Sequence, residues 1–178
     1  MLRKAYADTF GLIMELAHNR QLWDQYPMRT NNEKSPHREL SDIWVRYNPI
    51  ENFDGDVARF NAQHVPRWYP CIKYLPSAKA LCERLAYDFD ADIGGVLITK
   101  IPAHKQCYPH IDDGWHARYY EKYALQVKGH KDQSFHVEDQ ELVTTDGDLF
   151  WFDNAHAHWV KNDSDEDRIT MVTCLRRH

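Results

Sequence analysis

The chain has 178 residues, of which 43% are apolar and 28% charged, a composition typical of one soluble globular domain rather than of a disordered chain. Its 22 basic and 27 acidic side chains leave a net charge of −5, which argues against a general nucleic-acid-binding surface. Apolar runs stay short of the ~20 residues that cross a bilayer, and Asp8 and Glu15 interrupt the N-terminal stretch, so we expect a cytoplasmic protein without a membrane span or a cleavable signal.

The N-terminal half begins with a helical pattern followed by a loop and a strand. Residues 5–22 place five apolar side chains at helical spacing, which predicts an amphipathic helix. These five are Tyr6, Phe10, Ile13, Met14 and Ala17. The polar stretch 24–40 contains two prolines and is interpreted as a loop. Residues 41–47 alternate and carry β-branched and aromatic side chains, which predicts a strand.

A second helix is expected before the middle of the chain. Residues 48–63 show no regular pattern. Ser77 has the side chain of an N-cap, and the helix is expected from Ala78 to about Phe89, with Leu81 and Leu85 on its apolar face.

From residue 92 onward the pattern changes to short strand-like runs. They cover 96–101, 107–111, 123–127, 133–137, 142–144, 149–152, 156–160 and 169–175. Short runs joined by turns, without helical segments between them, predict an antiparallel sandwich or barrel. We therefore expect an α+β, mainly β protein with one domain, 1–178. Residues 1–91 would form a helical support with at least one strand, and residues 92–178 the β core that carries the functional site.

Three short motifs in the β half carry side chains that suit a metal site. His110 and Asp112 stand two residues apart, so both point to the same side of a strand. One or two further histidines, His156 and His158, follow in a later strand-like run. Arg168 and Thr170 form another pair separated by two residues.

Two histidines and one carboxylate form the facial triad of non-haem Fe(II) oxygenases, which leaves open coordination positions. A deeper arginine can bind a second carboxylate through two parallel hydrogen bonds. Each motif alone is weak, because His-X-Asp occurs by chance and the other histidines and Arg168 could be surface side chains. Their order along the chain and their placement on predicted strands favour a metal site.

Through these residues the sequence resembles the Fe(II)- and 2-oxoglutarate-dependent dioxygenases, and among them the aspartyl/asparaginyl β-hydroxylase branch. The similarity covers about residues 92–176. It includes His110-Ile-Asp112, Gly147-Asp148, Phe152-Asp153-Asn154, His158-Trp-Val160, Asn162 and Arg168. The resemblance implies a double-stranded β-helix, the jelly-roll or cupin-like core, with the N-terminal helices packed on one face.

The resemblance also implies the roles of the site residues. Fe(II) would be held by His110, Asp112 and His158, since the alignment through Phe152 and Val160 selects His158 rather than His156. The distal carboxylate of 2-oxoglutarate would bind Arg168, helped by Thr170 and by Tyr123. One departure from the family is that residues 121–125 lack the Arg-X-His pattern of the branch.

The reaction implied is hydroxylation of an unactivated C–H bond, with consumption of O₂ and release of succinate and CO₂. The expected partner is an amino acid, a peptide side chain or a related small molecule, and the net charge disfavours nucleic acid. Trp115, Arg118 and Tyr119 follow the triad carboxylate and either recognise an acidic or planar group or form an ordinary solvated loop. The alternatives are a non-catalytic cupin-like binding protein, against which Arg168 argues, and a structural β domain with fortuitous histidines.

Overall fold

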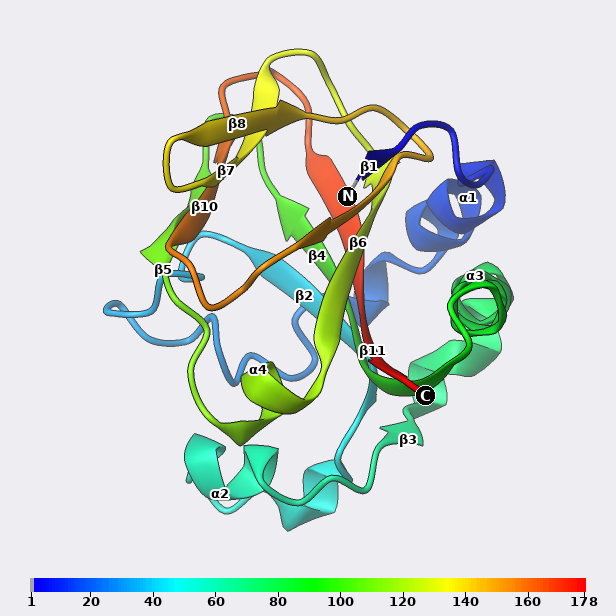
Figure 1. The fold of residues 1–178 in the computed structure, drawn as a ribbon, viewed down its shortest axis with the longest axis vertical. Coiled ribbons are helices and arrows are strands. Elements are labelled where there is room, and N and C mark those ends of the chain that lie inside the picture. The colour runs from blue at the N-terminus through cyan, green and yellow to red at the C-terminus, as the bar shows by residue number, and fades with distance from the viewer. Residues whose placement is uncertain (1) are drawn as a thin grey trace.

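Two antiparallel sheets form the core of the computed structural model, which describes residues 2–178 (Figure 1). The larger sheet has the strand order β1-β9-β6-β11-β4-β2-β3 and the smaller one β5-β10-β7-β8. The strands of the larger sheet are β1 (Leu2–Arg3), β2 (Ser41–Tyr47), β3 (Arg67–Trp68), β4 (Ala91–Ile101), β6 (Glu121–Lys128), β9 (Leu149–Phe152) and β11 (Arg168–Arg177). Those of the smaller sheet are β5 (Gln106–His110), β7 (Gln133–Val137), β8 (Gln140–Val143) and β10 (His158–Asn162).

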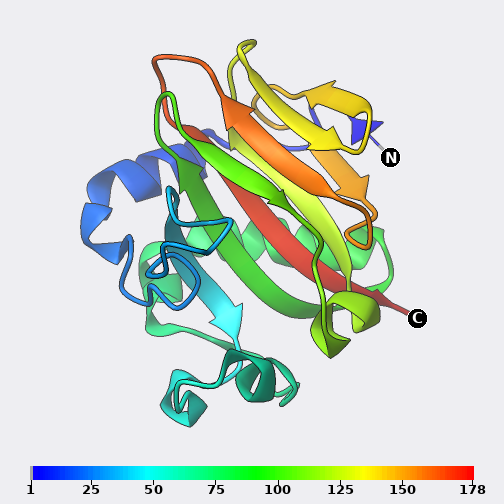
Figure 2. The ribbon, with the colours of Figure 1, turned by 90° about the vertical axis from the view of Figure 1, so that its left-hand side faces the viewer.

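The smaller sheet covers one face of the larger sheet (Figure 2). Alternation along the strands gives each sheet two faces. On β6, Leu125 joins the core under the helices, whereas Ala124 joins a second cluster with Phe135 and Val160 of the smaller sheet. The expected double-stranded β-helix core is confirmed, and the space that contains the candidate site lies between its two sheets.

Helices cover the other face of the larger sheet. They are α1 (Phe10–His18) and α3 (Pro76–Asp88), joined by the short 3₁₀ segments η1 (Arg20–Leu22), η2 (Ile50–Asn52) and η3 (Pro70–Tyr74) and by α2 (Val57–Asn61). Leu12 and Leu16 of α1 are buried, whereas Phe10 and Met14 are exposed. The apolar face predicted for the first helix is therefore wrong, because the buried face is rotated about the helix axis relative to it. No helix within residues 2–178 combines the length and the apolar character needed to cross a membrane.

The second helix begins two residues earlier than predicted, at Pro76 instead of Ala78. Leu75 is the N-cap and Pro76 the first helical residue, so the prediction that Ser77 caps the helix is wrong. Instead the Ser77 backbone N–H and hydroxyl both donate to the carboxylate of Glu15 on α1, the hydroxyl at 2.6 Å. A carboxylate at a helix N-terminus satisfies free N–H groups and complements the helix dipole. Glu15 thereby fixes α1 against α3.

The Gly147-Asp148 motif anchors the N-terminus to the β core. Gly147 has a φ of 82°, and a Cβ atom there would lie 2.3 Å from the Ala7 carbonyl oxygen, so only glycine fits. The Asp148 carboxylate is buried and accepts hydrogen bonds from the backbone N–H groups of Ala5 and Thr145. This part of the family pattern is therefore structural and lies outside the candidate site.

Candidate active site

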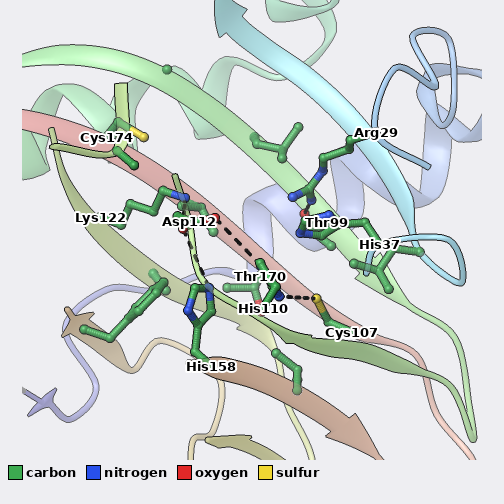
Figure 3. A pocket seen from close by; sticks show the side chains of 18 of the residues that line it. Arg29, His37, Thr99, Cys107, His110, Asp112, Lys122, His158, Thr170 and Cys174 are labelled. Carbon is green, nitrogen blue, oxygen red and sulfur yellow. Dashed lines mark hydrogen bonds and ion pairs between the residues drawn. The ribbon is translucent and has the colours of Figure 1, made fainter. Parts of the chain in front are cut away.

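A cavity of about 240 Å³ lies between the two sheets. Ligand pockets for drug-sized molecules have volumes of ~300–1,000 Å³, so this one suits small molecules. Strands of both sheets form its walls, and the segment between η1 and β2 contributes Arg29 and His37 to its side (Figure 3).

Three side chains of the cavity converge on one point. His110 at the end of β5 and His158 at the start of β10 are direct partners in the strand ladder. Their Nε2 atoms lie 3.8 and 3.6 Å from the two carboxylate oxygens of Asp112. Each of the three residues offers one ligand atom, and these three atoms all lie within 4.8 Å of one another. The Asp112 backbone N–H donates to the carbonyl oxygen of Asn154, which ties the loop after β5 to the segment before β10.

The hydrogen bonds of the two imidazoles leave both Nε2 atoms available to a metal. His110 Nδ1 lies 2.8 Å from the carbonyl oxygen of Tyr108, and His158 Nδ1 lies 3.0 Å from that of His156. A carbonyl only accepts, so each Nδ1 carries the proton and each Nε2 presents a lone pair. Burial lowers the pKa of both histidines, which keeps them neutral. The donor set is thus two neutral imidazole nitrogens and one carboxylate, which fits a divalent transition metal.

His37, Cys107 and His110 form a second group with ligand atoms within 4.8 Å of one another. Cys107 Sγ approaches the Nδ1 atom of His110, at 4.0 Å, and that atom already donates to Tyr108. Burial raises the pKa of the Cys107 thiol to about 11, so it is protonated at neutral pH. A protonated thiol is a poor metal ligand, and the nearby Nδ1 atom of His110 is already used in its hydrogen bond to Tyr108.

Lys122 of β6 forms an ion pair with Asp112 that the sequence analysis did not predict. Burial would raise the pKa of the Asp112 carboxyl, but the ammonium of Lys122 outweighs burial and lowers it. Asp112 is therefore ionised, as a metal ligand must be. Strand alternation could have indicated Lys122, since Lys122 lies two residues before Ala124 and both residues line the cavity.

Arg168 is buried at the other end of the cavity, where no carboxylate of residues 2–178 pairs with it. Its Nη1 atom donates to the Thr170 hydroxyl at 2.6 Å, and its Nη2 atom is buried with no hydrogen-bond partner among residues 2–178. Burial lowers its pKa to about 10, which still leaves the guanidinium charged at neutral pH. A buried cation with a free donor is costly unless a ligand completes it, so this end of the cavity fits the carboxylate of a small acid.

Tyr123 does not belong to the cavity. It follows Lys122 on β6 and so points to the opposite face, where its ring packs against Phe89. Its hydroxyl donates to the Glu121 carboxylate at 2.7 Å. The prediction that Tyr123 contacts 2-oxoglutarate is wrong, because neighbouring residues of a strand point to opposite faces and the cavity face of β6 carries Lys122 and Ala124.

His156 lies outside β10 and at the surface. The strand begins at His158, so His156, which falls inside the predicted run 156–160, does not belong to it. His156 is half-exposed, with its Nδ1 atom 2.8 Å from the Glu138 carboxylate. Of the rim residues, Trp115 and Tyr119 belong to a short helix, α4 (Trp115–Tyr119), and stack on each other, while Arg118 pairs with Asp113 at the surface.

Arg29 is a cavity residue contributed by the segment that the sequence analysis interprets only as a loop. Its guanidinium binds both oxygens of the buried Asp42 carboxylate, at 2.6 and 2.9 Å, and donates to the Thr99 hydroxyl. Burial alone would lower its pKa, but Asp42 outweighs burial and raises it. Arg29 is thus a satisfied cation, unlike Arg168. The acidic residue Asp42 inside the predicted strand 41–47 was the available signal.

Acid is expected to destabilise the protein through its buried histidines. Burial lowers the pKa of His116 from 6.5 to about 4, so below pH 6.5 the unfolded chain takes up this proton before the folded one. The free energy of unfolding should therefore fall by up to ~1.4 kcal/mol per pH unit for this residue. Urea unfolding at several pH values between 7.5 and 4.5 should show a shallower fall for His116→Gln than for the wild type. An unchanged slope would contradict the burial of a neutral His116. The control is the surface variant His156→Gln: because Glu138 raises the pKa of His156, this variant should not make the fall shallower.

The family model described as "Aspartyl/Asparaginyl beta-hydroxylase" matches residues 13–178. Curated proteins give no match.

Three solved structures are similar in fold. A 2OG-Fe(II) oxygenase family oxidoreductase from Burkholderia pseudomallei has 13% identity and a TM-score of 0.55, with 78% of this chain and 67% of that chain covered. The viral collagen prolyl hydroxylase vCPH from Paramecium Bursaria Chlorella virus-1, solved with 2OG, has 9% identity and a TM-score of 0.54, with 100% and 95% covered. A Pseudomonas putida prolyl-4-hydroxylase has 14% identity and a TM-score of 0.51, with 100% and 92% covered.

Proposed function

The chain belongs to the aspartyl/asparaginyl β-hydroxylase family, and from that premise we propose that it is an Fe(II)- and 2-oxoglutarate-dependent oxygenase. Its substrate would be an amino acid, a peptide side chain or a related small molecule with an unactivated C–H bond. The observation that carries the proposal is that one cavity contains both a His-Asp-His group and the buried Arg168, whose Nη2 atom has no hydrogen-bond partner among residues 2–178. The similarity in fold to an oxygenase of the 2OG-Fe(II) family and to a prolyl hydroxylase solved with 2OG supports it.

The residues present fit the cofactors that this function requires. His110, Asp112 and His158 would hold the ferrous ion through two Nε2 atoms and a carboxylate oxygen. Arg168 would fork onto the distal carboxylate of 2-oxoglutarate, with the Thr170 hydroxyl beside it. When bound together, Fe(II), 2-oxoglutarate and O₂ supply the oxidising chemistry and yield succinate and CO₂.

The protein itself positions the reactants and excludes water. The carbonyl oxygens of Tyr108 and His156 hold the two imidazole rings in one tautomer and one orientation. Phe135, Phe150 and Phe152 are buried on the cavity wall and give it an apolar lining. Such a lining strengthens the interaction of Arg168 with a carboxylate, because it lowers the local dielectric constant.

The second candidate is a cupin-like protein that binds a metal or a small ligand without turnover. A His-Asp-His group is sufficient for metal binding, whereas a carboxylate ligand is needed to compensate the buried charge of Arg168. Succinate formation separates the two. The protein with Fe(II), O₂ and 2-oxoglutarate should release succinate, and addition of a true substrate should accelerate the release. Metal binding without 2-oxoglutarate turnover under any substrate tested would favour the binding protein.

A further inference from the structure

His37 and Cys107 lie next to the His-Asp-His group, and the proposed oxygenase chemistry uses neither of them. His37 comes from the segment between η1 and β2, Cys107 from β5, and both line the cavity. One nitrogen of His37, the sulfur of Cys107 and one nitrogen of His110 all lie within 4.8 Å of one another. Figure 3 shows His37 and Cys107 on the side of His110 that faces away from Lys122.

The imidazole of His37 has a lone pair that no other residue uses. Its backbone N–H binds the Ser35 hydroxyl, and its ring contacts the ring of His110 edge to face at 4.6 Å. Within residues 2–178, neither ring nitrogen of His37 has a hydrogen-bond partner. Burial and the charge of Arg29 lower the pKa of His37, so the ring is neutral and one of its nitrogens can bind a metal.

Cys107 is protonated in the absence of a metal, but its surroundings are not hostile to a thiolate. Burial raises the pKa of the thiol, and so do the carboxylates of Asp112 and Asp42. The guanidinium groups of Arg29 and Arg168 lower it. An ion that prefers sulfur displaces the proton of a thiol when it binds, which releases that proton to the solvent.

The spacing of the two free ligand atoms suits an ion with two ligands in a line. His110 is not available as a third ligand, because its Nδ1 atom donates to the Tyr108 carbonyl. Metal bonds of ~2.3 Å to sulfur and ~2.0 Å to nitrogen place the ligand atoms of a linear site ~4.3 Å apart. The His37 nitrogen and the Cys107 sulfur, within 4.8 Å of each other, meet this requirement after a shift of no more than about 0.5 Å.

We propose that His37 and Cys107 form a second metal site, selective for the soft ion Cu⁺, and that Cu⁺ bound there excludes 2-oxoglutarate. Thiolate ligands select Cu⁺, whereas the two imidazoles and the carboxylate of the neighbouring group suit harder divalent ions. Binding replaces the S–H bond of Cys107 with a sulfur–copper bond, and copper keeps its oxidation state.

The exclusion of 2-oxoglutarate follows from the position of this site and rests on the proposed function. The Cys107 sulfur lies 4.0 Å from the Nδ1 atom of His110, and the charge of Arg168 acts on the same sulfur. An ion held by Cys107 therefore lies between the His-Asp-His group and Arg168. 2-Oxoglutarate would have to occupy this part of the cavity in order to reach both of them.

Anaerobic titration of the metal-free protein with Cu⁺, in competition with a chromogenic Cu⁺ chelator, tests the site itself. The wild type should bind one equivalent, and X-ray absorption should find one sulfur and one nitrogen around copper. Cys107→Ser should lower the affinity at least ~100-fold and His37→Gln at least ~10-fold, since even an outer partner of a ligand contributes ~10–100-fold. Cys174→Ser is the matched control, because Cys174 is also a buried thiol on the cavity wall, and it should keep the affinity.

The site is overturned if the wild type binds no Cu⁺, if its copper spectrum contains no sulfur, or if Cys107→Ser keeps the wild-type affinity. His158→Ala separates this site from the His-Asp-His group and should keep the affinity for Cu⁺. Loss of Cu⁺ binding in His158→Ala but not in Cys107→Ser would place copper among the ligands of the other group. The spectrum of the wild type decides the question even where a variant does not fold.

The exclusion is tested with Fe(II) and 2-oxoglutarate together, in the absence of oxygen. One equivalent of Cu⁺ should remove the charge-transfer band of the Fe(II) and 2-oxoglutarate complex in the wild type and leave it in Cys107→Ser. A band that persists in the wild type with Cu⁺ bound would overturn the exclusion. Failure of the proposed function is distinguishable, because the band would then be absent without copper while Cu⁺ binding stays measurable.

Discussion

Replacing His158 with alanine is expected to abolish Fe(II)-dependent succinate formation while the protein stays folded. The imidazole supplies one of three ligand atoms, and its Nε2 faces Asp112 across 3.6 Å. Loss of even an outer hydrogen-bond partner of a metal ligand costs ~10–100-fold in metal affinity, so loss of the ligand itself should cost at least ~100-fold. His110→Ala should behave in the same way. The measurements are metal affinity by titration and succinate release at saturating 2-oxoglutarate.

The neighbouring histidine is the control for this prediction. His156 is half-exposed and pairs with Glu138, outside β10 and away from the cavity. His156→Ala should therefore keep most of the activity and the metal affinity. The opposite pattern, an inactive His156→Ala and an active His158→Ala, would show that the metal is bound by the other histidine.

Arg168→Ala is expected to raise the 2-oxoglutarate concentration needed for half-maximal activity at least ~30-fold, which corresponds to ~2 kcal/mol. The guanidinium is 3% exposed, so its loss leaves a carboxylate to be buried without a partner. The affinity for the metal alone should change little, because Arg168 has no contact with the His-Asp-His group among the hydrogen bonds of residues 2–178. Titrations with 2-oxoglutarate and, separately, with metal measure both effects.

Two variants on the same strand sharpen the test. Arg168→Lys keeps the charge but not the planar fork, so it should recover only part of the affinity. Arg176→Ala removes an exposed arginine whose Nη1 donates to the Tyr119 carbonyl, and it should leave the 2-oxoglutarate dependence unchanged. The anchor role fails if Arg168→Ala needs no more 2-oxoglutarate than the wild type.

The sequence predicts the elements whose pattern is local. Strands expected at 41–47, 133–137 and 149–152 agree with β2, β7 and β9 to the residue. Short runs of β-branched and aromatic side chains between turns identify them, and in β9 Leu149 and Phe150 are buried on the two faces of the sheet. The five-residue helices α2 and α4 were missed, because one turn of helix between turns has no measurable period.

The cavity shows where local pattern stops being informative. Lys122 reaches Asp112 and Arg29 reaches Asp42 through tertiary contacts, and no spacing along the chain indicates either pair. Tyr123 was misassigned because neighbouring residues of a strand point to opposite faces, and the cavity face of β6 is the one that carries Lys122 and Ala124. The choice of His158 over His156 as the ligand agrees with the structure, in which β10 begins at His158. Arg168 and Thr170 were selected by family resemblance, and the unpartnered Nη2 atom adds a physical reason to expect a carboxylate there.

The central claim is that one cavity binds Fe(II) and 2-oxoglutarate together, and anaerobic titration tests it most directly. Addition of 2-oxoglutarate to the protein with one equivalent of Fe(II) should produce a weak metal-to-ligand charge-transfer band in the visible spectrum. The band should be absent with either component alone, absent in His158→Ala, and shifted to higher 2-oxoglutarate concentration in Arg168→Ala. A wild-type protein that binds Fe(II) but shows no band at saturating 2-oxoglutarate would contradict the account.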